Sequence, residues 1–121
     1  MKTEITMNYN SKVESGILSL TLEGNLIGEE VGSDLIKEVD AAMGQDIVFC
    51  LIDIGSVKYI NSSGIGVLIT ILTKFRNKGG EVYIVNPSEH VKKLLIITKL
   101  NAIFNIEKTV EEAKLKLKSQ N

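Results

Sequence analysis

The chain has 121 residues, which is enough for one domain with one hydrophobic core, so we expect a single domain over residues 1–121. Hydrophobic residues make up 44% of the sequence and the formal net charge is −1, which argues against a disordered chain and against a nucleic-acid binder that relies on a basic surface. No apolar run reaches membrane-spanning length and the first residues lack the apolar core of a signal peptide, so we expect a soluble, cytoplasmic protein with no membrane contact.

The beginning of the chain predicts a β-hairpin. Residues 4–9 alternate weakly between polar and apolar side chains, as an edge strand does, and residues 8–11 are rich in turn formers that would close this strand. Residues 16–23 alternate with period two from Leu18 onward, which predicts a half-buried strand. The two runs are close enough in the chain to pair as antiparallel strands.

The middle of the chain predicts a crossover unit. Apolar residues recur at helical spacing over residues 31–43, and Gly44 is expected to end that helix. Residues 47–54 form an apolar run typical of a central strand, residues 64–77 have helical spacing, and residues 81–85 predict a second buried strand. A strand, a helix and a strand in this order predict a parallel, right-handed crossover.

The last third of the chain predicts two more helices and a short strand. Ser88 is expected to cap a helix that buries Val91, residues 102–106 to form the last strand, and Thr109 with Glu112 to form a capping box at the start of a terminal helix. The expected fold class is therefore α/β, with one mixed sheet of four to five strands and about four helices packed on it.

The segment Asn61-Ser62-Ser63-Gly64-Ile65-Gly66 is the most informative stretch of the chain, because it joins a strand to a helix. A helix that begins here presents free backbone N–H groups. The two serine hydroxyls can cap the helix, and one of them could carry a phosphate whose charge the helix end would stabilise. The two glycines either serve close packing or leave the N-terminal end of the helix, called the helix mouth below, open to another molecule.

The helix over residues 64–77 is apolar nearly all round, which allows two interpretations. Its inner stripe is predicted to consist of Ile65, Leu68, Ile69, Leu72 and Phe75. In one interpretation the helix is squeezed between its sheet and a neighbouring helix. In the other, Gly64, Val67 and Ile71 lie off the stripe and form a partner surface beside Ser62.

Three blocks of this sequence resemble the STAS domain, and in particular the small stand-alone anti-sigma factor antagonists of bacteria. They are residues 51–68, the glycine pair at 79–80 with the strand that follows it, and residues 91–106, so the resemblance covers nearly the whole chain. The family's usual pattern at the helix start is Asp-Ser-Ser/Thr-Gly-Leu-Gly. Here Asn61 replaces the Asp, which keeps a capping side chain but removes a charge, and Lys99 stands where a Gly is common.

The resemblance implies a phosphorylation switch. By residue match, Ser62 is phosphorylated by a partner that is both an anti-sigma factor and a serine kinase, and a PP2C-type phosphatase removes the phosphate. The unphosphorylated form is expected to bind the anti-sigma factor and release the sigma factor, with no cofactor and no direct contact to nucleic acid. The partner-binding residues are then Asn61, Ser62, Ser63, Gly64, Val67, Ile71 and Asp53, although Asp53 could equally be a polar cap on its loop.

Two other classes of function stay open. An enzyme would need a base for a serine nucleophile, and the one histidine, His90, is expected at an exposed helix start, so we expect no enzyme. The one cysteine, Cys50, lies in an apolar run and is expected to be a buried filler, and no metal-ligand spacing is present. A third class is a STAS-like module that is not phosphorylated, either a scaffold in a sensory complex or a subunit of a membrane transport system.

Overall fold

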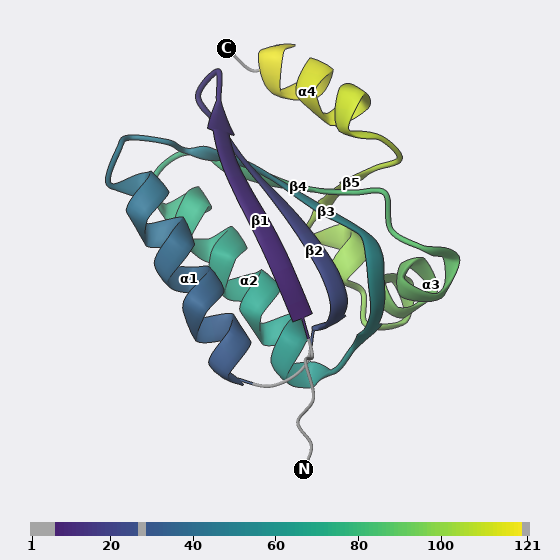
Figure 1. Cartoon of the computed structure of the whole chain (residues 1–121). Helices are drawn as coiled ribbons and strands as arrows, with labels where there is room; N and C mark the ends of the chain where they lie inside the picture. The colour runs from purple at the N-terminus through teal and green to yellow at the C-terminus, as the bar shows by residue number, and fades with distance from the viewer. Residues whose placement is uncertain (1–6, 27–28, 120–121) are drawn as a thin grey trace.

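The computed structural model describes residues 7–26 and 29–119 of the chain. Its elements, in chain order, are β1 (Met7–Glu14), β2 (Ile17–Leu26), α1 (Glu29–Met43), β3 (Phe49–Ile60), α2 (Ser62–Asn77), β4 (Glu81–Val85), α3 (Glu89–Ile97), the 3₁₀ turn η1 (Leu100–Ala102), β5 (Asn105–Glu107) and α4 (Val110–Ser119). The strands form one sheet in the order β1-β2-β3-β4-β5, in which only the β1–β2 pair is antiparallel. This confirms the expected mixed α/β sheet (Figure 1).

The hairpin turns at a different place from the one expected. Ser15 and Gly16 have φ values of 56° and 79°, and they connect the paired residues Glu14 and Ile17 as a two-residue turn. Positive φ at both central positions matches the twist of the flanking strands. The turn expected at residues 8–11 was wrong, because these polar residues lie in the edge strand β1, where exposed side chains are tolerated and the backbone pairs with β2. Residues 4–6 of the expected strand lie outside the described residues.

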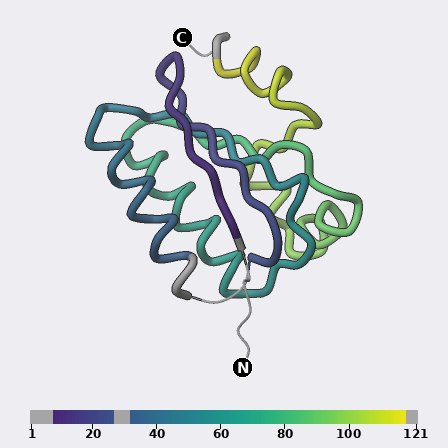
Figure 2. The backbone as a smooth tube through the Cα atoms, in the orientation of Figure 1, coloured from purple at the N-terminus to yellow at the C-terminus, as the bar shows by residue number. Residues whose placement is uncertain are grey.

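Three helices cover one face of the sheet and the fourth covers the other. The connections from β2 to β5 step across the sheet in one direction, and right-handed crossovers of this kind place α1, α2 and α3 on the same face. The larger core accordingly joins Leu35 of α1, Leu68 of α2 and Val91 of α3, while a smaller core on the opposite face contains Ala113 and Leu117 of α4. Helices α1 and α2 lie side by side (Figure 2).

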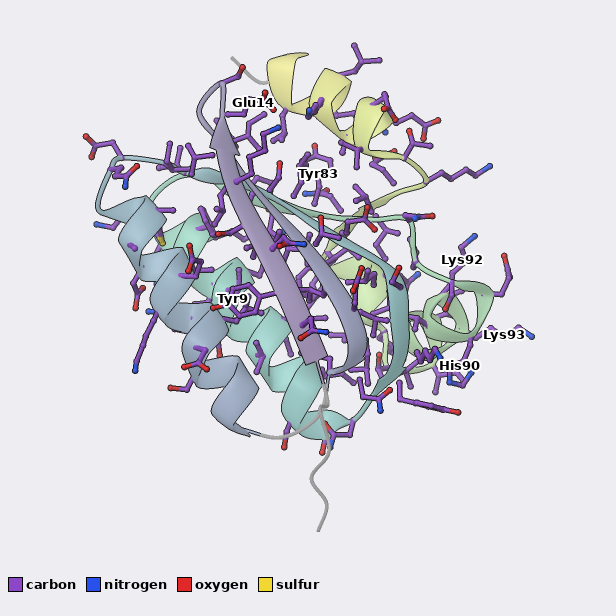
Figure 3. The ribbon with its side chains drawn as sticks, in the orientation of Figure 1. Tyr9, Glu14, Tyr83, His90, Lys92 and Lys93 are labelled. Carbon is purple, nitrogen blue, oxygen red and sulfur yellow. The ribbon has the colours of Figure 1, made fainter. Side chains whose placement is uncertain are left out.

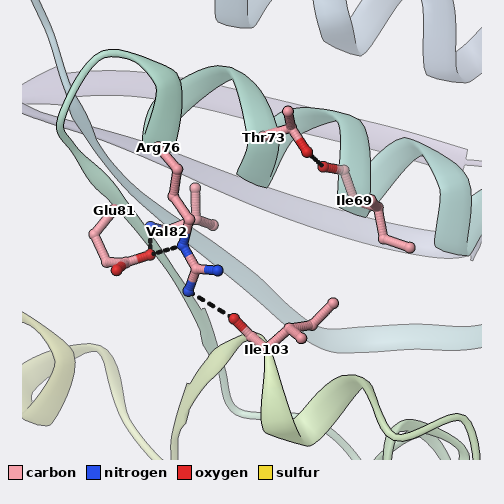
Figure 4. Close-up of polar contacts among 6 residues, drawn as sticks. All are labelled: Ile69, Thr73, Arg76, Glu81, Val82 and Ile103. Carbon is pink, nitrogen blue, oxygen red and sulfur yellow. Dashed lines mark hydrogen bonds and ion pairs between the residues drawn. The ribbon is translucent and has the colours of Figure 1, made fainter.

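Polar contacts fix the ends of several elements. Ser88 Oγ accepts a hydrogen bond from Val91 N at 3.2 Å, which confirms the expected cap of α3. Thr109 Oγ1 accepts one from Glu112 N at 3.1 Å, so this half of the expected capping box is confirmed. The guanidinium of Arg76, near the end of α2, donates to Glu81 Oε1 at 2.9 Å and to the carbonyl oxygen of Ile103 at 2.7 Å (Figure 4). This side chain therefore ties α2 to β4 and to the segment before β5.

The last strand is shorter and later than expected. It covers Asn105–Glu107, whereas Ala102 ends the 3₁₀ turn η1. The expected strand over residues 102–106 was therefore wrong in its first part, because Phe104 N and Ile103 N both bond back to the carbonyl of Leu100 in a turn. Among the described residues, none of the helices combines the length and the apolar character that crossing a membrane requires.

Candidate functional site

Ser62 is the first residue of α2 and lies at the carboxyl end of β3, where open α/β sheets commonly place their functional residues. Its side chain is exposed, and no other group among the described residues forms a hydrogen bond with its hydroxyl. Within the part of the chain that the structure describes, the hydroxyl therefore has no bonding partner at the positive end of the helix dipole.

Asn61, and neither serine, caps the helix. Its backbone is extended, with φ −108° and ψ −174°, and its Oδ1 accepts a hydrogen bond from Gly64 N at 2.9 Å. The expectation that a serine hydroxyl would cap α2 was wrong, because Asn is as good a cap as Ser and precedes both serines in the chain. The cap leaves Ser62 free for another role.

Gly64 anchors the helix mouth to the end of β2. A Cβ at this position would lie on the carbonyl oxygen of Leu26 and 3.0 Å from Leu26 Cγ. The N–H of Asn61 donates to the same carbonyl oxygen at 3.4 Å. Gly64 is buried, so its expected place on a partner surface was wrong, and its task is close packing of helix against strand.

The apolar face of α2 that was expected to meet a partner is covered by α1. Ile71 is fully buried at 0% exposure and Val67 is 9% exposed, with Gly32 of α1 directly against the Val67 methyl group. The assignment of Ile71 to a partner surface was therefore wrong, and the interpretation of a helix squeezed between sheet and neighbour is confirmed. Ile65 and Ile69 are half-buried on the other flank of α2 instead of lying at the centre of the stripe.

A groove of about 520 Å³ runs between α1 and α2 beside the helix mouth. It is lined by Gly32, Ser33, Ile36, Lys37, Ser63, Gly66, Val67 and Thr70. Gly66 is exposed, and a Cβ there would meet nothing within 4 Å. The sequence did not reveal this groove, since it depends on how closely α1 approaches α2.

Asp53 has a structural task at some distance from Ser62. Its Oδ1 accepts a hydrogen bond from Gly55 N at 2.9 Å, at the point where β4 stops pairing with β3. Seven more residues of β3 follow Asp53, as far as Ile60, so the extended strand separates the carboxylate from the start of α2. The expected loop after Asp53 was wrong, because this residue lies within β3 and its carboxylate bonds to the backbone of the same strand.

The two groups considered for chemistry are separated from the site as well. His90 is exposed at the start of α3, with its ring edge-to-face against Tyr59 at a centroid distance of 6.2 Å. Cys50 is fully buried, and burial raises the pKa of its thiol well above the usual range. Within residues 7–26 and 29–119, no three His, Cys, Asp or Glu side chains are grouped so that they could hold a metal ion.

Comparison with known proteins relates this chain to a family. A protein of Thermotoga neapolitana, provisionally named a homolog of an anti-sigma factor antagonist, is 36% identical over 63 residues, which cover 52% of this chain and 56% of that protein. The matched region thus spans about half the length of the curated relatives.

Two solved structures share the fold. The anti-sigma factor antagonist SpoIIAA in its unphosphorylated form has a TM-score of 0.80 at 18% identity, over 93% of this chain and 97% of that chain. The phosphorylated form of SpoIIAA from Bacillus has a TM-score of 0.71 at 17% identity, over 90% and 98% of the two chains. The family model of the STAS domain matches residues 8–113. The chain belongs to the STAS domain family.

Proposed function

We propose that this protein is an anti-sigma factor antagonist controlled at Ser62. In its unphosphorylated form it binds an anti-sigma factor that is also a serine kinase, and the sigma factor is released. Phosphate on Ser62 switches this binding off, and a PP2C-type phosphatase restores it. The observation that carries the proposal is the exposed Ser62 hydroxyl at the first position of α2, which forms no hydrogen bond with any residue that the structure describes. The names of the relatives and the solved phosphorylated form of SpoIIAA support it.

The fold should survive phosphorylation. A phosphate adds about −1.5 to −2 charges at neutral pH. At a helix N-terminus a negative charge is stabilised by about 0.3–1 kcal/mol when it is exposed. Because Asn61 supplies the cap and the Ser62 side chain is exposed, a phosphate on Ser62 would extend into solvent and would not displace the cap.

Binding, in contrast, should not survive. A partner that docks over Ser62 must remove water from the phosphate, and desolvating an unpaired charge costs several kcal/mol. Since about 1.4 kcal/mol corresponds to a tenfold change in affinity, a loss of about 100-fold or more is expected. The exposed residues at the start of α2 include Asn61, Ser62, Ser63 and Gly66, and the rim of the α1–α2 groove lies beside them.

Asn61 fits the same scheme. Its side chain fulfils the capping task of the family's usual Asp through the bond to Gly64 N. A kinase would meet a neutral residue before Ser62 instead of a negative one. We infer that the charge of the family's Asp is not needed to hold the helix mouth in shape.

The test measures binding of the anti-sigma factor to three variants of the full chain. Ser62→Ala should bind as the parent does, and Ser62→Asp should bind at least tenfold more weakly. The matched control is Thr73→Asp, which adds the same charge to an exposed position of the same helix about 16 Å farther along its axis, at 1.5 Å per residue. Circular dichroism should show folded protein in every case.

Two results would contradict the proposal. Equal affinity of Ser62→Ala and Ser62→Asp would mean that charge at this position does not control binding. Equal weakening by Ser62→Asp and Thr73→Asp would mean that the helix responds to charge in general. Either result would favour a STAS module that is not phosphorylated, such as a scaffold or a transport-system subunit.

A further inference from the structure

The second half of β3 has a strand neighbour on one side only. β2 pairs with β3 as far as Ile60, whereas β4 pairs with it only as far as Asp53, opposite Val85. Figure 1 shows the lower part of β3 continuing past β4, with β2 on one side and α3 on the other. A strand without a neighbour presents unpaired N–H and C=O groups along its free edge. Among the described residues, the segment from Ser56 to Ile60 has no backbone partner beyond β2.

The open edge results from bulges in the pairing with β2. The register shifts between Thr21 and Glu23 and again between Gly24 and Asn25, and each shift leaves β3 with more residues than β2. Such insertions bend the strand and increase its twist. β4 does not follow this bend, because its chain leaves the sheet at Asn86, where φ is 60°.

A groove of about 580 Å³ lies along this edge. It is lined by Gly55, Ser56, Val57, Lys58, Tyr59, Ser88 and His90. One wall is thus the free edge of β3 and the other is the start of α3. Tyr59 is 60% exposed, and its ring rests edge-to-face on the ring of His90. The groove therefore combines free backbone groups, an exposed aromatic ring and an open entrance.

The charge of the groove favours an anionic ligand. Among the described residues that line the groove, Lys58 carries a charge and none is acidic. Neither Lys58 nor Lys93 forms an ion pair with a described residue, whereas Lys92 pairs with Glu89 at 3.9 Å. Figure 3 shows Lys92 and Lys93 extending outward from α3, on the element that forms the second wall. An anionic chain complements this surface.

We propose that an acidic, extended segment of the partner protein lies in this groove and pairs with residues 56–60 of β3. Added strands gain affinity from main-chain hydrogen bonds and specificity from side-chain pockets. The identity of the partner rests on the proposed function, because Ile60 is followed directly by Asn61 and Ser62. A segment bound here ends beside the helix mouth, so a phosphate on Ser62 repels the acidic groups of the segment as well as resisting desolvation.

The test uses a fluorescein-labelled synthetic peptide of alternating Glu and Val, with a Lys and Val peptide of the same length as its control. The acidic peptide is titrated into the isotope-labelled full chain and followed by NMR. It should produce saturable changes in the backbone amide chemical shifts of residues 55–60 and 88–93. Lys58→Glu should weaken binding of the acidic peptide by about tenfold or more, and Lys78→Glu, an exposed cation outside the groove, should leave it unchanged. Backbone N-methylation of the peptide should also weaken binding, because it removes donors for strand pairing.

The inference is overturned if the acidic peptide produces no saturable change in amide chemical shifts, or changes them only on another surface. It is also overturned if the Lys and Val peptide binds equally well. The peptide is titrated into the unphosphorylated chain, where no phosphate on Ser62 affects it, so the two proposals fail separately. If the peptide does not bind while Ser62→Asp still weakens anti-sigma factor binding, only the groove proposal falls. If the peptide binds while Ser62 variants all bind the anti-sigma factor equally, only the switch falls.

Discussion

The two glycines at the helix mouth should respond in opposite directions to the same substitution. In Gly64→Ala the new methyl group would lie on the carbonyl oxygen of Leu26, so the start of α2 and the end of β2 have to separate. Overpacking of this kind costs about 1–3 kcal/mol, and the backbone partner leaves little room to relax. In Gly66→Ala the methyl group would enter open space, and the helix gains about 0.5–1 kcal/mol from the better propensity of Ala.

These free energies translate into clear shifts of the melting temperature. For a chain of 121 residues, 1 kcal/mol corresponds to about 4 °C. Gly66→Ala should therefore melt about 2–4 °C higher than the parent, and Gly64→Ala about 4–12 °C lower. Urea denaturation followed by circular dichroism gives the same free energies independently, provided that the slope of the transition is unchanged.

Two results would contradict the packing described for Gly64 and Gly66. Gly64→Ala with parental stability would mean that the helix mouth does not pack on Leu26 as described. Destabilised Gly66→Ala would mean that the space above this position is filled in the folded protein. Because Gly66 faces the groove beside Ser62, a stabilised Gly66→Ala that binds the anti-sigma factor less tightly would indicate that the partner approaches the helix backbone here.

Three further experiments test other parts of the structure. Asn61→Ala should lower the stability by about 1 kcal/mol because Gly64 N loses its acceptor, and Asn61→Asp should retain it; equal chemical denaturation of both variants would contradict the cap. Lys99 has a φ of 64°, so Lys99→Gly should raise the stability by roughly 0.5–1 kcal/mol, whereas a loss would mean that this side chain holds the turn. The buried Cys50 thiol, whose pKa is raised by burial, should react with a disulfide reagent only as fast as the protein unfolds, and immediate labelling would show an accessible core.

The order of elements could be predicted from the sequence because each carries a strong local signal. The strand at Glu81–Val85 is a continuous apolar run between turn residues, and the end of α1 at Met43 coincides with the expected stop at Gly44. The hairpin turn at Ser15 and Gly16 was missed because residues 8–11 carry a stronger turn composition than the true turn does. Cross-strand pairing overrides such local preferences.

The candidate site could be located from the sequence, but which of its residues are exposed could not be predicted. The position of Ser62 at a strand-to-helix junction was predictable from the change in period. Which flank of α2 is buried was not, since Ile65 and Ile71 have the same chemistry and only the position of α1 distinguishes them. The open edge of β3 was equally invisible, because it depends on bulges and on where β4 leaves the sheet.

Docking of the anti-sigma factor should depend on the charge carried at the exposed Ser62 hydroxyl, the first residue of α2. The most direct measurement phosphorylates the full chain at Ser62, compares its anti-sigma factor affinity and melting temperature with those of the unmodified chain, and repeats both after phosphatase treatment. The phosphorylated chain should bind at least about 100-fold more weakly, its melting temperature should be unchanged or slightly higher, and the affinity should recover fully after the phosphate is removed. Unchanged affinity in the phosphorylated, folded protein would contradict this dependence on charge.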